Sequence, residues 1–153
     1  MNNKIKIGLS LIALGLIGYI YLSPKQEIKE QNPETVKEEI TYDRASTDLI
    51  VVELPFPGAV TGKEFSVIGK ARGMWFFEAS FPIDVLDKDG KILVQTYATA
   101  QGEWMTEEFV PFKGDVKVPE SYIGPATLVL KKDNASGLPE HDASISFPFT
   151  IEY

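Results

Sequence analysis

The chain has 153 residues, a formal net charge of −7 at pH 7 and no cysteine. The whole acidic excess lies after Ala45, and an acidic module repels phosphate backbones, which excludes nucleic acid as a partner. The lack of cysteine excludes disulfide bonds, thiolate metal sites, a cysteine nucleophile and a lipid-modified N-terminal cysteine.

Residues 1–23 have the pattern of a membrane anchor. Ile7–Leu22 is free of charged residues and follows Lys4 and Lys6. As a helix this stretch would measure about 24 Å, and its flanking residues extend it toward the ~30 Å of a hydrocarbon core. We therefore expect residues 5–23 to cross the cell membrane once. The preceding basic residues favour a cytoplasmic N-terminus and an extracytoplasmic C-terminal domain.

A cleaved secretory signal is the alternative for this segment. Cleavage requires small residues at the cut, whereas Tyr19–Leu22 is bulky and Pro24 follows closely. The sequence therefore favours an uncleaved signal anchor. Residues 24–47 are polar and rich in charge, and they predict a flexible linker that lifts the following domain off the membrane.

Residues 48–153 predict an all-β domain. Apolar stretches recur at short spacing, separated by turns that contain glycine, proline, aspartate or asparagine. We expect seven strands, at Asp48–Leu54, Glu64–Lys70, Trp75–Leu86, Lys91–Thr99, Phe109–Val118, Ala126–Lys132 and Ser144–Tyr153. Short strands of this number favour an immunoglobulin-like β-sandwich. Pro148 cannot donate a ladder hydrogen bond, so the last strand should be an edge there or pair on one side only.

The third of these strands is predicted to organise the domain. Every second residue from Trp75 to Val85 is apolar, and alternate side chains of a strand share one face. Phe76 and Glu78 fall on the opposite face. The expected core comprises Trp75, Phe77, Phe81, Ile83, Val85, Leu128, Leu130, Phe147, Phe149 and Ile151.

Six short segments follow one another in a characteristic order: Val67–Gly73, Trp75–Phe81, Asp87–Gly90, Gly102–Met105, Phe109–Phe112 and Asp133–Gly137. Together they resemble the immunoglobulin-like domain of bacterial spore germination, a family often found beside the germane module in envelope proteins. The resemblance covers about Leu54 to Ile151. It implies an immunoglobulin-like sandwich outside the bacterial membrane that serves as a binding or assembly module.

Candidate contact residues lie in loops and at strand ends. Phe76 would either join an exposed contact patch or be covered by a loop. Trp104 and Met105 lie between strands, and both residue types are favoured at binding surfaces, although a loop tryptophan can equally close one end of the sandwich. Asn134 lies in the turn-rich segment before the last strand. The loops around Trp104 and Asn134 are therefore the predicted contact region.

Other residues have a structural interpretation. Arg72 and Glu78 flank the aromatic run. They are interpreted as a structural ion pair, or as a backbone anchor where strands meet, rather than as a recognition pair. Asp87–Gly90 begins like a calcium loop but lacks the other ligands, so we interpret it as a tight hairpin turn. His141 is the only histidine, and no serine stands in a nucleophile elbow. We therefore expect no catalytic residue, no cofactor and no metal site.

These observations favour a non-catalytic binding or assembly module of the cell envelope, whose partner is another envelope protein or a cell-wall component. The alternative is a cell-wall carbohydrate-binding module that stacks sugars on Trp104 and Phe76. A hydrolase that uses acidic residues such as Glu107 and Glu108 has the weakest support.

Overall fold

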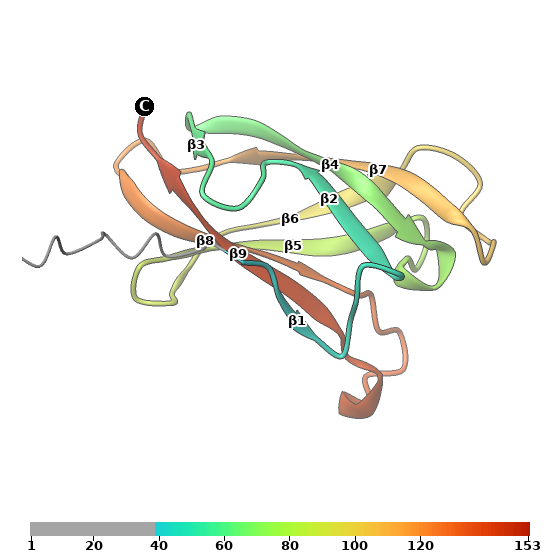
Figure 1. The fold of residues 1–153 in the computed structure, drawn as a ribbon. Helices are drawn as coiled ribbons and strands as arrows, with labels where there is room; N and C mark the ends of the chain where they lie inside the picture. Colours follow the sequence, from blue (N-terminus) through green and yellow to red (C-terminus); the bar gives the residue numbers. More distant parts are fainter. Residues whose placement is uncertain (1–38) are drawn as a thin grey trace, which may run out of the picture. The chain divides into compact units, whose positions relative to one another are not determined.

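The computed structural model describes residues 39–153, and the predicted anchor at residues 5–23 lies outside the described residues. Within residues 39–153, no helix is long and apolar enough to cross a membrane. These residues form strands and two short 3-10 helices, η1 and η2 (Figure 1). The elements are β1 (Thr41–Asp43), β2 (Ile50–Leu54), β3 (Val60–Thr61), β4 (Glu64–Arg72), η1 (Gly73–Trp75), β5 (Ser80–Asp87), β6 (Ile92–Ala100), β7 (Phe109–Lys117), β8 (Gly124–Lys131), η2 (Pro139–His141) and β9 (Ser144–Ile151).

The strands form one hydrogen-bonded ladder that folds over into two layers (Figure 1). Its order is β1-β9-β8-β5-β6-β7-β4-β2, and β3 pairs in parallel with β9. β6 and β7 share only two residue pairs near the C-terminal end of β6, and there the ladder turns from one layer into the other. Phe81 of β5 and Phe112 of β7 meet edge to face between the layers, with ring centroids 4.9 Å apart. The predicted all-β sandwich is confirmed.

The seven predicted strands are present, and two short strands add to them. β1 lies within the segment predicted as a linker, and its three residues pair antiparallel with Ser144–Ser146 of β9. The β-structure therefore includes residues before Asp48. Three exposed polar residues give no apolar pattern, so only the free edge of β9, whose backbone groups β1 satisfies, makes this segment a strand.

Pro148 lies where β9 has a strand on one side only, as its missing N–H predicts. Thr127 of β8 is its partner on one side. On the other side β1 pairs with residues 144–146 and β3 with residues 150–151. Between these two short strands the Gly58 N–H donates to the Pro148 carbonyl at 2.8 Å. The proline therefore costs the ladder no hydrogen bond.

The first half of the third predicted strand is wrong. β5 begins at Ser80, because Phe77 and Ser80 exchange backbone hydrogen bonds of 3.0 and 3.1 Å and close a hairpin turn. Glu78 and Ala79 have φ angles of 48° and 63°, the left-handed pair of a type I′ turn. The turn reverses the two faces, so Phe76 is only 4% exposed whereas Phe77 is 45% exposed.

The core is otherwise the predicted one, since the nine other expected core residues are buried. Phe81 stands at its centre, with its ring centroid 5.3 Å from that of Phe76 and 6.3 Å from that of Trp75. Each buried aromatic side chain of this kind contributes about 1.5–3 kcal/mol of transfer free energy. The aromatic cluster therefore fastens the segment before β5 to the sandwich and positions the loops described next.

Candidate partner-binding surface

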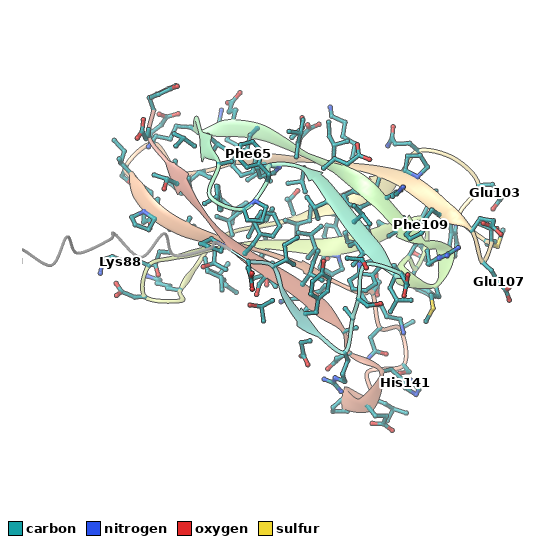
Figure 2. The ribbon with its side chains drawn as sticks, viewed as in Figure 1. Phe65, Lys88, Glu103, Glu107, Phe109 and His141 are labelled. Atoms are coloured by element: carbon teal, nitrogen blue, oxygen red, sulfur yellow. The ribbon has the colours of Figure 1, made fainter. Side chains whose placement is uncertain are left out.

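Three loops meet at one end of the sandwich, which we call the loop end: residues 73–79, residues 101–108 and residues 132–143. A Cβ atom on Gly73 would overlap the carbonyl oxygens of Trp104 and Thr106, so the first two loops pack backbone to backbone. The Asp133 N–H donates to the Trp75 carbonyl at 3.0 Å and joins the third loop to the first. Figure 2 shows Glu103, Glu107 and Phe109 at this end, far from Lys88.

Exposed apolar side chains gather on these loops. Met105 is 74% exposed and Met74 is 59% exposed, and Phe77 stands beside the hairpin tip. Trp104, in contrast, is half-buried and packs against the core. Of the two neighbouring residues predicted as contacts, Met105 therefore faces solvent, whereas Trp104 supports the loop from below. Methionine side chains adapt to the shape of a partner, which suits a contact surface.

The three loops of the loop end are rich in carboxylates. They carry seven, which belong to Glu78, Glu103, Glu107, Glu108, Asp133, Glu140 and Asp142. Burial raises the pKa of Asp133 above its ordinary value, and the negative charge of Glu78 raises the same pKa further. The carboxylates of Glu78 and Asp133, which belong to different loops, are therefore close enough for the charge of Glu78 to act on Asp133. A surface that combines exposed apolar side chains with negative charge complements a segment that carries both apolar and basic side chains.

The predicted ion pair between Arg72 and Glu78 is not formed. Arg72 donates from Nε to the Asp48 carbonyl at 3.0 Å and from Nη1 to the Glu107 carbonyl at 3.1 Å. Its carboxylate neighbour is Glu108, at 3.7 Å. The hairpin turn carries Glu78 to an exposed tip, which is why the sequence spacing misleads. Arg72 instead ties together the backbones of two chain segments, an anchoring role that its five-donor guanidinium suits.

Asn134 shapes its own loop. Its Nδ2 donates to the Leu138 carbonyl at 2.8 Å and to the Asp142 carboxylate at 2.7 Å, and its Oδ1 accepts from the Ser136 hydroxyl at 2.6 Å. The predicted contact residue is therefore engaged inside the loop. The Ser136 hydroxyl also lies 3.1 Å from His141 Nδ1. Asp142 bonds to Asn134, so it does not orient the histidine as a catalytic base would require.

The structure removes Phe76 from the set of candidate contact residues and adds Met74 and Phe77 to it. Phe76 is buried against Phe81, so it cannot meet a partner. Sequence reasoning missed Phe77 because the turn that exposes it contains no glycine or asparagine, the usual signals of a type I′ turn. The only sequence signal that Met74 would lie beside another loop was Gly73, since a glycine at a strand end permits close approach of another backbone.

The turn at Asp87–Gly90 is a hairpin, as its sequence predicts. The Asp87 carboxylate accepts from the N–H groups of Asp89 and Lys91, at 2.8 and 2.9 Å. Gly90 adopts a φ of 79°, which a glycine tolerates. The bond from Lys91 lowers the pKa of Asp87, and the carboxylate is occupied in closing the turn.

The family model for the immunoglobulin-like domain of bacterial spore germination matches residues 49–137. The matched segment runs from β2 into the loop that Asn134 closes, and it contains the other two loops of the loop end in full. No curated protein and no solved structure matches the chain.

Proposed function

Since the chain belongs to the family of immunoglobulin-like domains of bacterial spore germination, we propose that it is a non-catalytic binding or assembly module of the bacterial cell envelope. In this proposal the loop end binds another envelope protein. The observation that carries it is that Met74, Phe77 and Met105 are exposed on two loops whose backbones pack against each other at Gly73. Apolar side chains gathered at one exposed place are typical of interaction sites.

The charge of the loop end defines the partner. The three loops carry seven carboxylates and one lysine, Lys132, whose Nζ donates to the His141 carbonyl at 3.4 Å. Arg72, at the end of β4, is already bonded to backbone carbonyls and to Glu108. A partner segment with apolar anchors and flanking lysine or arginine side chains satisfies both features. Because Trp104 rests on the core, the loop that carries Met105 needs little ordering when the partner binds.

The proposal includes a single-pass anchor at residues 5–23, with the N-terminus in the cytoplasm and the domain outside. Its support is the uncharged stretch Ile7–Leu22 behind Lys4 and Lys6. The carbohydrate-binding alternative has lost one of its two stacking residues, because Phe76 is buried. Trp104 keeps only its exposed edge for a sugar.

Site-specific crosslinking tests the proposal on the full-length chain in its own membrane. A photoreactive residue replaces Met105 in one variant and Ile92 in the matched control. Ile92 is similarly apolar and half-exposed, and it follows the hairpin that contains Lys88 at the opposite end (Figure 2). We expect one discrete crosslinked protein from position 105 and none from position 92. In a further variant, the photoreactive residue replaces Met74 and Met105→Glu is added. This variant should give no crosslinked product, because the new glutamate places a charge among the exposed apolar side chains.

Two outcomes contradict the proposal. Equal crosslinking from positions 105 and 92 would show that the loop end has no preferred partner. Sedimentation of the chain with protein-free cell-wall sacculi, abolished by Trp104→Ala in a variant that still folds, would favour the carbohydrate-binding alternative. Binding to a protein with no sedimentation supports the assembly module.

A further inference from the structure

One edge of β4 is only half covered. β7 pairs with all nine residues of β4, from Glu64 to Arg72. On the other edge β2 pairs only with Ile68–Ala71, because Pro55 ends β2. Among the residues that the structure describes, no strand pairs with Glu64–Val67 on this edge. The uncovered length leaves backbone groups without a ladder partner.

The backbone of Ser66 points toward this uncovered edge. The Arg72 N–H donates to the Leu49 carbonyl at 2.8 Å, so the backbone groups of Arg72 face the β2 side. The Val118 N–H donates to the Lys63 carbonyl at 2.8 Å, so those of Lys63 face the opposite side. Backbone groups alternate along an antiparallel strand. The N–H and C=O of Ser66 and Glu64 therefore face the edge that β2 leaves open.

An apolar hollow of about 240 Å³ adjoins this edge. Its lining includes Leu54, Phe56, Val60, Thr61, Phe65 and Ser66. Phe65, labelled in Figure 2, packs on Phe149 with ring centroids 5.4 Å apart, whereas Phe56 and Val60 are more than half exposed. The Thr61 hydroxyl is buried and has no hydrogen-bond partner, which is rare in folded proteins. The hollow thus offers apolar walls beside the open edge of β4.

Two carboxylate residues are direct neighbours of residues that line the hollow. Glu53 precedes Leu54 in β2, and the Glu152 N–H donates to the Thr61 carbonyl at 3.0 Å, which places Glu152 beside β3. Both side chains are exposed, and neither forms an ion pair within residues 39–153. An occupant with basic residues at its ends complements this rim. A second copy of this acidic domain would instead bring like charges together.

We propose that the uncovered edge of β4 and the adjoining hollow form a strand-docking slot for an extended, apolar and basic segment of a partner protein. The segment pairs with the backbone of Ser66 and Glu64 as an added strand, which gives affinity through main-chain hydrogen bonds. One of its apolar side chains fills the hollow between Val60 and Phe65. The slot is separate from the loop end, since Glu64 and Arg72 stand about 26 Å apart along an extended strand.

A peptide of defined sequence tests the slot. The probe is the acetylated and amidated hexapeptide KVTLTK, which alternates apolar and polar residues between two lysines. The protein is the full-length chain, ¹⁵N-labelled and held in a mild detergent. We expect a Kd below about 1 mM, a shift of the Ser66 amide signal and hydrogen exchange at Ser66 slowed about tenfold or more. The same peptide with N-methyl groups on alternate residues keeps its charge and side chains, and it should bind about tenfold more weakly or worse.

Variants of the protein locate the site. Val60→Lys places a flexible charge at the exposed wall of the hollow and should weaken the peptide about tenfold. Ile92→Lys, at a similarly exposed apolar residue of β6, is the matched control and should leave binding unchanged. The glutamate-ended peptide EVTLTE should not bind, because it meets Glu53 and Glu152.

Several results would overturn the strand-docking slot. They are the absence of binding by KVTLTK, equal binding by its N-methylated form, and an unchanged Kd in Val60→Lys. Slow hydrogen exchange at Ser66 before any peptide is added would overturn it as well, because another part of the chain or a second copy would then fill the slot. Diluting the protein distinguishes occupation by another part of the chain from occupation by a second copy, since only a second copy dissociates on dilution.

Discussion

The Arg72 guanidinium lies over the Phe109 ring, 4.2 Å from its centroid. It reaches this position from the last residue of β4, and Phe109 is the first residue of β7, so the stack closes the ladder of these two strands at the loop end. The same guanidinium donates to the carbonyls of Asp48 and Glu107. One side chain therefore joins the approach to β2, the end of β4 and the loop that carries Met105.

Removing this anchor should destabilise the domain. Arg72→Met keeps much of the length of the side chain but loses two charged hydrogen bonds and the cation–π contact. We expect a loss of about 2 kcal/mol in the free energy of unfolding, measured by urea denaturation. Lys70→Met is the matched control, because Lys70 lies 5.3 Å from the centroid of the same ring. It should cost less than about 0.5 kcal/mol, and equal losses in both variants would contradict the anchoring role.

Two adjacent phenylalanines should respond very differently to truncation. Phe76→Ala removes a buried ring that packs on Phe81 and should cost about 3–4 kcal/mol, because it leaves a cavity. Phe77→Ala removes a ring that is nearly half exposed and should cost less than about 1 kcal/mol. Thermal and urea unfolding of both variants measure the difference. A larger loss of stability in Phe77→Ala than in Phe76→Ala would contradict the turn and favour the uninterrupted strand that the sequence pattern predicts.

The hairpin turn before β5 should tolerate glycine better than its native residue. Ala79 has a φ of 63°, where a Cβ atom is unfavourable, so Ala79→Gly should stabilise the domain by about 0.5 kcal/mol after the entropy cost of glycine. Gly90→Ala is the reverse test. It should cost about 1 kcal/mol, because a Cβ atom is unfavourable at a φ of 79°, and no more than that, because this Cβ would meet no atom within 4 Å. Destabilisation by Ala79→Gly would be evidence against the type I′ turn.

Two aspartates should influence stability with opposite dependence on pH. The folded-state pKa of Asp133 is raised, so the folded domain holds this proton longer than the unfolded chain, whose pKa is near 3.8. Stability is therefore lost as pH rises from the unfolded pKa through the folded one. Asp133→Asn should match the native chain at about pH 3 and exceed it in stability at about pH 7. Urea midpoints at several pH values measure this.

Asp87 provides the control for that experiment. The hydrogen bond from the Lys91 N–H lowers its pKa, so its stabilising contribution is present above the unfolded pKa near 3.8 and disappears as pH falls through the folded pKa. Asp87→Asn should therefore be less stable than the native chain near neutral pH and approach it in acid. If both variants changed stability in the same direction, neither assignment would hold.

The strands and most of the core follow directly from sequence periodicity. Phe81, Ile83 and Val85 occupy alternate positions of β5, so they share one face, and burial of that face removes their apolar area from water. Because Pro148 lacks an N–H, it predicts a position where the strand pairs on one side only. In the structure, Pro148 lies in the gap between β1 and β3, where β9 pairs only with β8. Both inferences rest on chemistry within a single strand.

The candidate contact surface needed more than local chemistry. The alternation from Trp75 to Val85 continues unbroken through a turn, so the pattern alone placed Phe77 inside and left Phe76 open to either side. The sequence also gives no sign that Glu78 lies away from Arg72, because that separation is produced by the turn. The loops that carry Met74 and Met105 meet because Gly73 lets their backbones pack closely, although they are far apart in the chain.

The sequence by itself determined the strand content, the acidic character and the family of this domain, because periodicity, charge and residue order are properties of neighbouring residues. The tertiary structure decided which aromatic side chains are buried, which partner Arg72 takes and where the edge of β4 is left open. Those outcomes depend on pairing between segments far apart in the chain. A strand is specified by its own alternation, whereas an uncovered edge is specified by where another strand ends.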